Sequence, residues 1–424
     1  AALTGRVFTP KQPFSDAPDR RLVLGLLHDR QGRVIDECLG VVCRAPHSYT
    51  GEETVELQCH GSPAMLAAGL EALLAAGARQ AGPGEFTRRA FLNGKLDLTQ
   101  AEAVVDLIDA ETADAAANAA GQLGGALKRA IEPVYDGLTD LCSHFHAVLD
   151  YPDEDIEDFG AAELSGALDR AGAALQELLA TYEKGRHLRQ GVRAVLLGKP
   201  NAGKSSLLNQ LAGYDRVIVT DIAGTTRDTV EEPVRVGRVL LRLTDTAGIR
   251  EAGDAIEALG VARSEQAARE AELALFVCDG SQPLTDEDRR AIEAAKCAPR
   301  SLALCNKSDL PAAVSPDELP FDTVLTVSAR TGAGLDALPA LLEGWFLGGN
   351  ACDGSLLTNP RQFGALDRAS RAIARAKTGL GLGVTPDAVL TDVEEAMAAL
   401  GEVTGRTVRE DITNRIFERF CVGK

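Results

Sequence analysis

Short apolar runs separated by polar turns fill the first sixty residues of this 424-residue chain. These runs predict strands over Leu22–Leu27, Val34–Val42 and Thr54–Cys59. A helix is expected over Pro63–Ala76, because Pro63 suits a first helical turn and Gly77 follows the last apolar position. The Gly-Pro-Gly segment Gly82–Phe86 is predicted as a loop near the end of this α+β region.

Strand signals nearly vanish between residues 97 and 190, where long alanine-rich amphipathic helices are predicted. A pattern typical of helices is found again from about Arg361 to the end of the chain. Between these blocks, strand and helix patterns alternate, which is typical of a doubly wound α/β domain. The expected strands are Val192–Leu197, Val234–Val236, Leu240–Thr244, Leu273–Cys278, Ser301–Cys305 and Val324–Val327. The pattern leaves open whether the flanking helical blocks form one domain or two.

Charge and cysteine content narrow the class of protein. The formal net charge of −18 argues against a uniformly basic nucleic-acid surface, although a local basic patch is compatible with it. Nine cysteines without a CxxC pair indicate reduced thiols and a cytoplasmic location. No apolar run reaches 18 residues, so no membrane insertion is expected. Because the chain begins with Ala1 rather than methionine, we expect its N-terminal region to be incomplete.

Residues 198–205 read G-x-x-x-x-G-K-S between an apolar run and a helix start. This strand–loop–helix context is that of a phosphate-binding P-loop. Glycines let the backbone N–H groups face phosphate oxygens, while the helix start adds a positive dipole. Lys204 supplies a point charge and Ser205 a hydroxyl ligand for magnesium.

Four further motifs follow the P-loop, several of them directly after predicted strands. They are Ala223-Gly224-Thr225-Thr226-Arg227-Asp228, Asp245-Thr246-Ala247-Gly248, Asn306-Lys307-Ser308-Asp309 and Ser328-Ala329-Arg330. A threonine of the first motif can reach magnesium, Asp245 can hold the ion through water, and the Gly248 N–H can reach a γ-phosphate. The Asp309 carboxylate matches the two N–H donors of a guanine edge, and the last motif can offer a backbone N–H to guanine O6. Together the five motifs predict a GTPase.

Two positions depart from the well-known signalling GTPases. Ile249 stands where those proteins have the glutamine that orients the attacking water. Acidic candidates for that task nearby are Glu251, Asp254 and Glu257. Asn201 places a neutral amide oxygen inside the P-loop, either as a ligand for a monovalent cation that replaces an arginine finger or as a loop-stabilising hydrogen-bond partner.

The chain ends in Cys421-Val422-Gly423-Lys424, where the cysteine is either a reactive thiol or a small buried residue. These motifs together resemble the TrmE family of Era-like GTPases. The likeness extends to segments outside the G domain, namely Tyr49–Glu53, Pro83–Thr87, Arg89–Leu98 and the terminal Cys421–Lys424.

The resemblance implies a multidomain α+β and α/β architecture. Residues 1–93 would form an N-terminal α+β domain that dimerises and binds tetrahydrofolate, such as 5-formyltetrahydrofolate or a methylene derivative. Residues 94–190 and 349–424 would form one discontinuous all-α helical domain. Residues 191–348 would form the inserted P-loop GTPase domain.

The resemblance also implies a function. With the FAD protein MnmG, family members add a carboxymethylaminomethyl or aminomethyl group to carbon 5 of the wobble uridine (position 34) of certain tRNAs. A tetrahydrofolate one-carbon unit and GTP hydrolysis serve this step, and potassium activates hydrolysis by pairing the G domains of a homodimer.

The resemblance and the motifs assign site residues. GTP is expected to contact Asn201, Ala202, Gly203, Lys204, Ser205, Ser206, Thr220, Asp221, Ile222, Ala223, Gly224, Thr225, Thr226, Asp245, Thr246, Ala247, Gly248, Asn306, Lys307, Asp309, Ser328, Ala329 and Arg330. The resemblance implies potassium ligands at Asn201, Thr220, Ile222 and Thr225, and magnesium ligands at Ser205 and Thr226. It implies folate contacts at Glu56, Lys95 and Lys424, and catalytic or coupling roles for Glu257, Arg227, Asp228 and Cys421.

Two other functions stay open at this point. An Era-like GTPase in ribosome assembly would carry an appended basic RNA-binding domain, whereas the flanks here are acidic or alanine-rich. A GTP-switched structural scaffold would keep tRNA modification unchanged when Cys421 or Arg227 is substituted.

Overall fold

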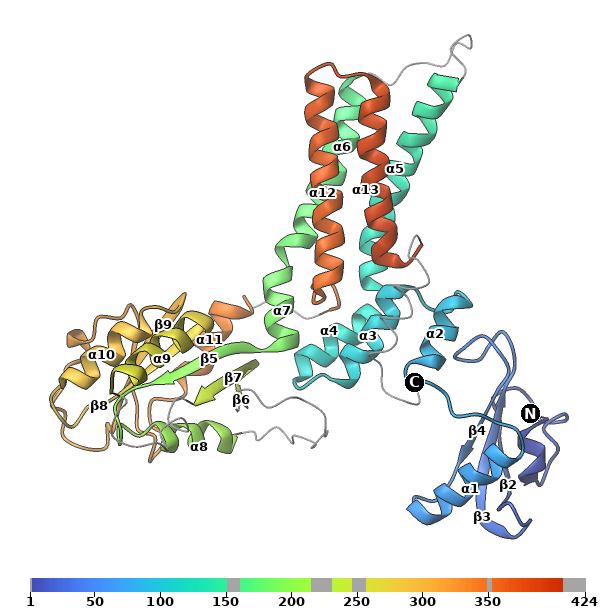
Figure 1. The fold of residues 1–424 in the computed structure, drawn as a ribbon, viewed down its shortest axis with the longest axis horizontal. Coiled ribbons are helices and arrows are strands. Elements are labelled where there is room, and N and C mark those ends of the chain that lie inside the picture. Colours follow the sequence, from blue (N-terminus) through green and yellow to red (C-terminus); the bar gives the residue numbers. More distant parts are fainter. Residues whose placement is uncertain (1, 151–160, 215–230, 246–256, 349–352, 407–424) are drawn as a thin grey trace. The chain divides into compact units, whose positions relative to one another are not determined.

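The computed structural model describes residues 2–150, 161–214, 231–245, 257–348 and 353–406 (Figure 1). The chain forms two compact units. The first unit comprises residues 1–105, 122–169 and 371–424, and the second comprises residues 106–121 and 170–370. The domain boundaries expected from the sequence stay a prediction.

A four-stranded antiparallel sheet opens the first unit. Its strands β1 (Phe8–Pro10), β2 (Leu22–His28), β3 (Val34–Cys43) and β4 (Thr54–Gln58) lie in chain order. The Phe8 ring occupies the space beside two glycines, since a Cβ at Gly25 or Gly40 would lie within 2.8 Å of that ring. The three predicted strands are confirmed, whereas β1 is too short to leave a periodic signal.

Helix α1 (Pro63–Ala75) follows β4 as predicted. A 3-10 helix, Thr4–Arg6, precedes β1 at the start of the chain. The predicted loop Gly82–Phe86 is wrong in its second half, because α2 (Glu85–Leu92) begins there. Gly84 adopts a left-handed conformation at φ +63° and Glu85 accepts a hydrogen bond from the Gly82 N–H. Glycine thus permits the sharp turn directly before α2. The Gly-Pro-Gly composition alone predicts a loop there.

Helices then dominate, as the alanine-rich pattern predicts. Their bounds are α3 (Leu98–Ile108), α4 (Ala113–Leu123), α5 (Ala126–Asp150), α6 (Ala161–Ala180), α7 (Tyr182–Gln190), α12 (Pro360–Gly381) and α13 (Pro386–Thr404). In the first unit α5 packs against α13, although hundreds of residues separate them in the chain (Figure 1). Buried Leu138 and Val393 belong to this helical core.

A six-stranded sheet forms the centre of the second unit, in the order β10-β9-β8-β5-β7-β6. Its strands are β5 (Val192–Leu197), β6 (Glu231–Val236), β7 (Val239–Asp245), β8 (Leu273–Asp279), β9 (Arg300–Asn306) and β10 (Val324–Thr326). The predicted α/β class is confirmed. Strand β6 alone runs antiparallel to its neighbour, because only two residues, Gly237 and Arg238, connect it to β7.

Helices cover both faces of this sheet. Strand β5 alternates its side chains, so that Ala194 and Leu196 enter one core and Val195 and Leu197 the other. The first core includes residues of α7, α8 (Lys204–Tyr214) and α11 (Ala337–Phe346). The second includes residues of α9 (Glu257–Glu270) and α10 (Asp286–Ala295). A 3-10 helix, Pro316–Glu318, precedes β10.

The seven cysteines within the described residues are all free thiols, as the sequence predicts. Among the helices of the described ranges, none is both long and apolar enough to cross a membrane.

Candidate functional site

The P-loop connects β5 to α8, and two of its glycines are required by close approach. Gly198 has φ +145°, and a Cβ there would lie 2.1 Å from the Val277 carbonyl oxygen. Gly203 has φ +99°, and a Cβ there would lie 2.1 Å from Nδ2 of Asn306. Any side chain at either position would therefore displace the loop from the sheet edge.

Lys204 is the first residue of α8, and its side chain folds back onto the P-loop. Its Nζ donates hydrogen bonds to the carbonyl oxygens of Gly198 at 2.6 Å and Lys199 at 2.9 Å, and the residue is only 9% exposed. The loop thus holds an ammonium group at the helix N-terminus, where phosphate oxygens would be alternative acceptors. Ser205 and Ser206 follow in the first helical turn and are exposed.

Asn306 joins three of the sequence motifs. Its Nδ2 donates to the Ala202 carbonyl of the P-loop at 2.8 Å, and its Oδ1 accepts from the Ala329 N–H at 2.9 Å. The side chain is 2% exposed. One buried amide therefore fixes the distance between the phosphate loop and the expected guanine side of the site.

Asp309 is presented at the same sheet edge. Its Oδ1 accepts a hydrogen bond from the Ser328 hydroxyl at 2.7 Å, and Arg330 lies 3.7 Å from Oδ2. The Ser328 hydrogen bond is the main cause that lowers the pKa of Asp309 below its usual value. The carboxylate is therefore ionised at neutral pH, as an acceptor for two N–H donors must be.

Lys307 lies between these residues in a left-handed conformation with φ +66°. Its Nζ forms a 2.6 Å ion pair with Asp279 at the end of β8. A left-handed conformation is uncommon for lysine, so the contacts around this turn must hold it in place, and the ion pair with Asp279 is one of them.

Strand order puts these motifs at a topological switch point. Strand β5 lies between β7 and β8, and both run parallel to it. Asp245 ends β7 in register with Leu196 of β5, so its backbone lies beside the P-loop strand. Ligands of open α/β sheets bind at such an edge, outside the carboxyl ends of the strands.

Several predicted site residues lie outside the described part of the chain. These are Thr220, Asp221, Ile222, Ala223, Gly224, Thr225, Thr226, Arg227, Asp228, Thr246, Ala247, Gly248, Cys421 and Lys424. Glu257 is the first residue of α9, but its side chain is likewise outside the description, as is that of Asp245.

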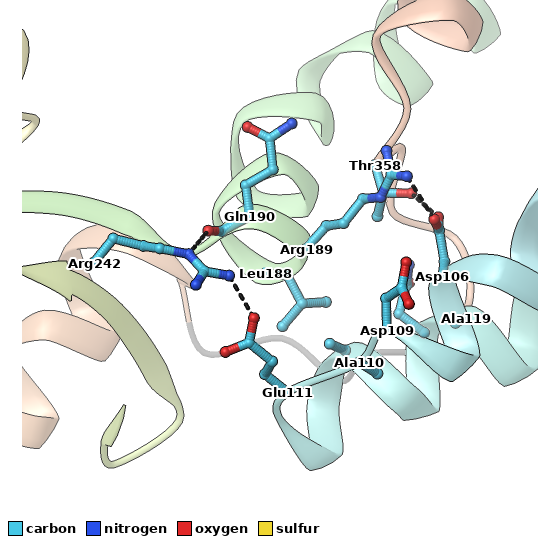
Figure 2. Close-up of a pocket in the computed structure, with 12 residues that line it drawn as sticks. Asp106, Asp109, Ala110, Glu111, Ala119, Leu188, Arg189, Gln190, Arg242 and Thr358 are labelled. Carbon is cyan, nitrogen blue, oxygen red and sulfur yellow. Dashed lines mark hydrogen bonds and ion pairs between the residues drawn. The ribbon is translucent and has the colours of Figure 1, made fainter. Parts of the chain in front are cut away.

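A polar cavity of about 430 Å³ was not predicted from the sequence (Figure 2). It belongs to the second unit and is lined by residues of α3, α4, α7 and β7. Arg242 of β7 bonds to Glu111 and to the Gln190 carbonyl, and Arg189 pairs with Asp106 at 2.8 Å. Sequence reasoning missed these pairs because their members are far apart in the chain and form no motif.

The signature segments of the first unit also meet. The Tyr49 hydroxyl lies 2.9 Å from the Thr87 hydroxyl, and Asn93 donates to the Thr50 carbonyl at 2.8 Å. Arg89 pairs with Glu52 at 3.0 Å. Three stretches that the sequence shows separately thus form one hydrogen-bonded surface around the start and end of α2.

Comparison with known protein families shows which family the chain belongs to. The family model described as the MnmE helical domain matches residues 98–421, and the model described as the GTP-binding protein TrmE N-terminus matches residues 1–95. The chain belongs to the MnmE family.

MnmE relatives resemble the chain over most of its length. A tRNA modification GTPase MnmE from Roseiflexus sp. (strain RS-1) is 45% identical over 99% of this chain and 93% of its own. The protein of that name from Chloroflexus aurantiacus is 43% identical over the same shares. The solved G domain of the T. maritima FeoB iron transporter covers 35% of this chain and 94% of its own, at 22% identity and a TM-score of 0.26.

Membership in the MnmE family confirms the resemblance inferred from the motifs and the predicted fold class. It also confirms the prediction of a GTPase, because the relatives are tRNA modification GTPases. Within the described residues, the P-loop, the Asn306 motif and the Ala329 motif lie at one sheet edge. The roles of individual residues stay predictions.

Two of the three expected folate residues fall within the described chain. Glu56 is exposed on β4, and Lys95 follows α2, where its Nζ donates to the Pro46 carbonyl at 3.0 Å. Lys95 lines a cavity of about 720 Å³ in the first unit, together with Lys128 and Arg406. Asp97 also lines this cavity, so three cationic side chains and one acidic side chain leave a positive balance, which favours an anionic ligand there.

Glu85 organises the charges beside these segments. It accepts hydrogen bonds from Arg79 and from the Gly82 N–H, and it also pairs with Arg89 at 2.8 Å. The Arg79 hydrogen bond is the largest contribution that lowers the pKa of Glu85 to about 2. Glu85 therefore stays ionised through the physiological range and fixes Arg89 against Glu52.

Proposed function

We propose that this chain hydrolyses GTP in the service of tRNA modification. The observation that carries the proposal is the Asn306 bridge, which holds the P-loop and the Ser328–Arg330 loop at one fixed spacing. A nucleotide that spans this spacing places its phosphates on the loop and its base against Asp309. The relatives named tRNA modification GTPase supply the class of substrate.

Nucleotide binding uses groups that the fold already orients. The P-loop N–H groups and Lys204 receive the phosphates, and the exposed Ser205 hydroxyl binds magnesium together with Thr226. The ionised Asp309 accepts two hydrogen bonds from guanine, and the Ala329 loop meets guanine O6. Adenine offers no matching pair of donors, so the site selects GTP over ATP.

Hydrolysis is proposed to depend on potassium. Asn201 is exposed at the mouth of the P-loop with φ +60°, a conformation that asparagine tolerates better than most residues. Its amide oxygen, with Thr220, Ile222 and Thr225, would ligate the cation beside the β- and γ-phosphates. The added charge there does the work of an arginine finger, and Glu257 positions the water that Ile249 does not orient.

The modification step is proposed to join folate and an FAD partner, MnmG. Glu56, Lys95 and Lys424 would contact a tetrahydrofolate, whose carboxylates suit the cationic cavity near Lys95. Its one-carbon unit would be used to add a carboxymethylaminomethyl or aminomethyl group to carbon 5 of the wobble uridine. Arg227 and Asp228 would couple the nucleotide state to this step, in which Cys421 also takes part.

A homodimer is proposed to present two such sites. Helix α1 exposes Leu66, Leu70 and Leu74 at a spacing of four residues, which forms an apolar stripe along one face. Such a stripe is a common feature of a subunit interface. Residues 1–95 and 98–421 match MnmE-type domains, which favours tRNA modification over the alternative, ribosome assembly.

GTP turnover in potassium and in sodium, measured over a range of protein concentrations, tests the nucleotide part. We expect stimulation by potassium alone and specific activity that rises with concentration as G domains pair. Glu257→Ala should lose most turnover and keep GTP affinity. Equal rates in the two salts would refute the cation site.

The tRNA part needs a separate readout. A bacterial strain that lacks its own member of the family would be complemented with this chain, and its tRNA nucleosides measured by mass spectrometry. We expect the modified wobble uridine to return with the natural chain and to be absent with Arg227→Ala. Unmodified tRNA alongside normal GTP turnover would count against tRNA as the substrate.

A further inference from the structure

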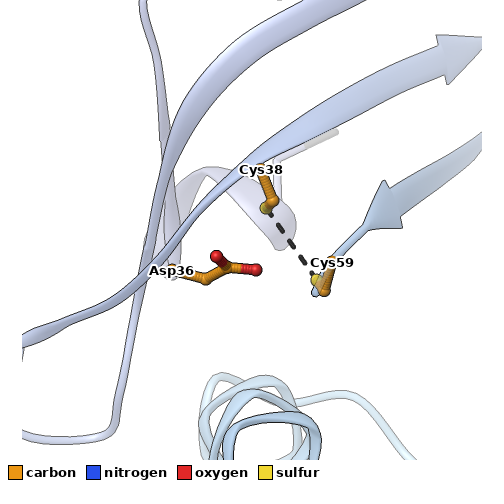
Figure 3. A group of neighbouring side chains, drawn as sticks. All are labelled: Asp36, Cys38 and Cys59. Carbon is orange, nitrogen blue, oxygen red and sulfur yellow. Dashed lines mark hydrogen bonds between the residues drawn. The ribbon is translucent and has the colours of Figure 1, made fainter. Parts of the chain in front are cut away.

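A sulfur and carboxylate cluster lies in the sheet of the first unit, and no step of the proposed function uses it. Asp36 and Cys38 belong to β3, and Cys59 directly follows β4. Leu39 pairs with Gln58 in the antiparallel register, which sets Cys38 opposite Cys59. Asp36 is two residues from Cys38 and shares its face of the sheet. Figure 3 shows the three side chains directed toward one another.

The distance between the two sulfur atoms fits a shared metal ion. Sγ of Cys59 lies 3.8 Å from Sγ of Cys38. A disulfide requires about 2.05 Å between sulfurs. A tetrahedral zinc ion about 2.3 Å from each sulfur separates them by about 3.8 Å. A carboxylate oxygen of Asp36 lies within 4.8 Å of both sulfur atoms, so a third ligand is already close.

His60 holds the Asp36 carboxylate in place. Its side chain is 8% exposed, Oδ1 lies 2.8 Å from Nδ1 of His60, and Oδ2 accepts from the His60 N–H at 3.0 Å. Both oxygens are thus oriented by a residue whose own ring is 82% exposed. An outer partner that orients a ligating carboxylate is a regular feature of metal sites.

We propose that Asp36, Cys38 and Cys59 bind a thiophilic divalent cation, of which zinc is the best match. Two thiolates and a carboxylate are three ligands of a tetrahedral site, and water would be the fourth. His60 acts as a positioning residue through Asp36. The bound ion joins β3 to the chain beyond β4 and stabilises the N-terminal sheet.

A second group of potential ligands in the described chain, Glu183, His187 and Glu272, is a weaker candidate. Arg186 and Arg193 both form ion pairs with Glu272. The charge of that carboxylate is already balanced, so a cation would have to displace a guanidinium group. The Asp36 group contains two sulfurs, which also gives it a distinct spectroscopic signature.

The test uses the full chain, reduced, free of nucleotide and kept in excess magnesium. After treatment with a chelator, cobalt(II) is added and the near-ultraviolet thiolate-to-cobalt charge-transfer band is recorded. We expect one equivalent to saturate the band, and zinc to displace cobalt and raise the thermal midpoint. Cys59→Ser and Cys38→Ser should each weaken binding at least tenfold and remove the zinc-dependent shift.

Cys43→Ser is the matched control, because Cys43 lies on β3 but on the opposite face from Cys38. It should bind cobalt as the natural chain does. His60→Gln should lower affinity and keep the charge-transfer band, since both thiolates remain. If Cys38→Ser does not fold by circular dichroism, the partly exposed Cys59 position decides the outcome.

Three results would overturn the proposal. One is the absence of a cobalt–thiolate band in the natural chain. Another is a band of full intensity in Cys59→Ser. The third is a Cys38–Cys59 disulfide found by mass spectrometry in the isolated protein, together with no metal uptake after its reduction.

Discussion

Two regions of the molecule are encoded by short motifs but are built differently. One is the nucleotide edge of the second unit, formed by the P-loop, Asn306 and the Ala329 loop. The other is the signature surface of the first unit, where Tyr49–Glu53 contacts residues of Pro83–Thr87 and Arg89–Leu98. At the nucleotide edge, a Cβ on Gly198 or Gly203 would lie only 2.1 Å from a neighbouring atom, and a buried amide connects two loops. On the signature surface, exposed charged side chains such as Arg89 and Glu52 pair with each other. Close packing makes the sequence of the nucleotide edge intolerant of substitution. The signature surface can lose one ion pair and keep its backbone conformation.

Gly198→Ala should have the largest effect. The new Cβ would meet the Val277 carbonyl oxygen at 2.1 Å in a backbone conformation with φ +145°. We expect the unfolding free energy to fall by at least about 2 kcal/mol and GTP binding to be lost. Chemical denaturation and nucleotide titration measure both. Gly344→Ala is the control, because a Cβ there meets nothing within 4 Å and alanine favours the helix.

Asn306→Ala comes next. It leaves the Ala202 carbonyl and the Ala329 N–H without their buried partner, each at a cost of roughly 1–3 kcal/mol. GTP affinity should fall at least tenfold, since the two loops lose their fixed spacing, and stability should fall with it. Asn209→Ala, an exposed position on α8, should change neither quantity. Similar losses in both variants would contradict the bridge.

Asp309→Asn should change specificity more than stability. A hydrogen bond to a charged group contributes about 1.5–3 kcal/mol, which corresponds to a roughly 10- to 100-fold loss of GTP affinity. The amide should instead accept xanthosine triphosphate, whose base edge exchanges a donor for an acceptor. Competition between the two nucleotides measures the switch, and an unchanged preference for GTP would place the guanine contact elsewhere.

Glu85→Gln should have the smallest effect and tests the signature surface. The folded-state pKa of Glu85, about 2, lies below its unfolded value of about 4.3. Its stabilisation is therefore present above pH 4.3 and is lost as the pH falls towards 2. Full conversion of this shift would give roughly 3 kcal/mol. The partners Arg79 and Arg89 are 67% and 43% exposed, so solvent screens both pairs and we expect a difference of less than about 1 kcal/mol between the natural chain and the variant at pH 7. Denaturation from pH 7 to pH 2 should show this difference shrinking, and a difference that grows towards low pH would reverse the sign.

Much of the fold follows from local patterns. Strand β5 is predicted to the residue, and the other strands of its sheet are predicted to within three residues at each end. The polar pairs of the cavity near Arg242 were not predicted, because Glu111 is 131 positions away and neither residue belongs to a motif. The Cys38–Cys59 pair was missed because it depends on the register between two strands.

The sequence by itself determined the P-loop, the guanine motif and the family resemblance, because these features lie within a few consecutive residues whose chemistry is readable from spacing. Tertiary structure alone decided that Asn306 bridges the P-loop and the Ala329 loop. It also decided that Cys38 faces Cys59. Both depend on strand order and register, which are set by the packing of whole sheets and not by any local run of residues.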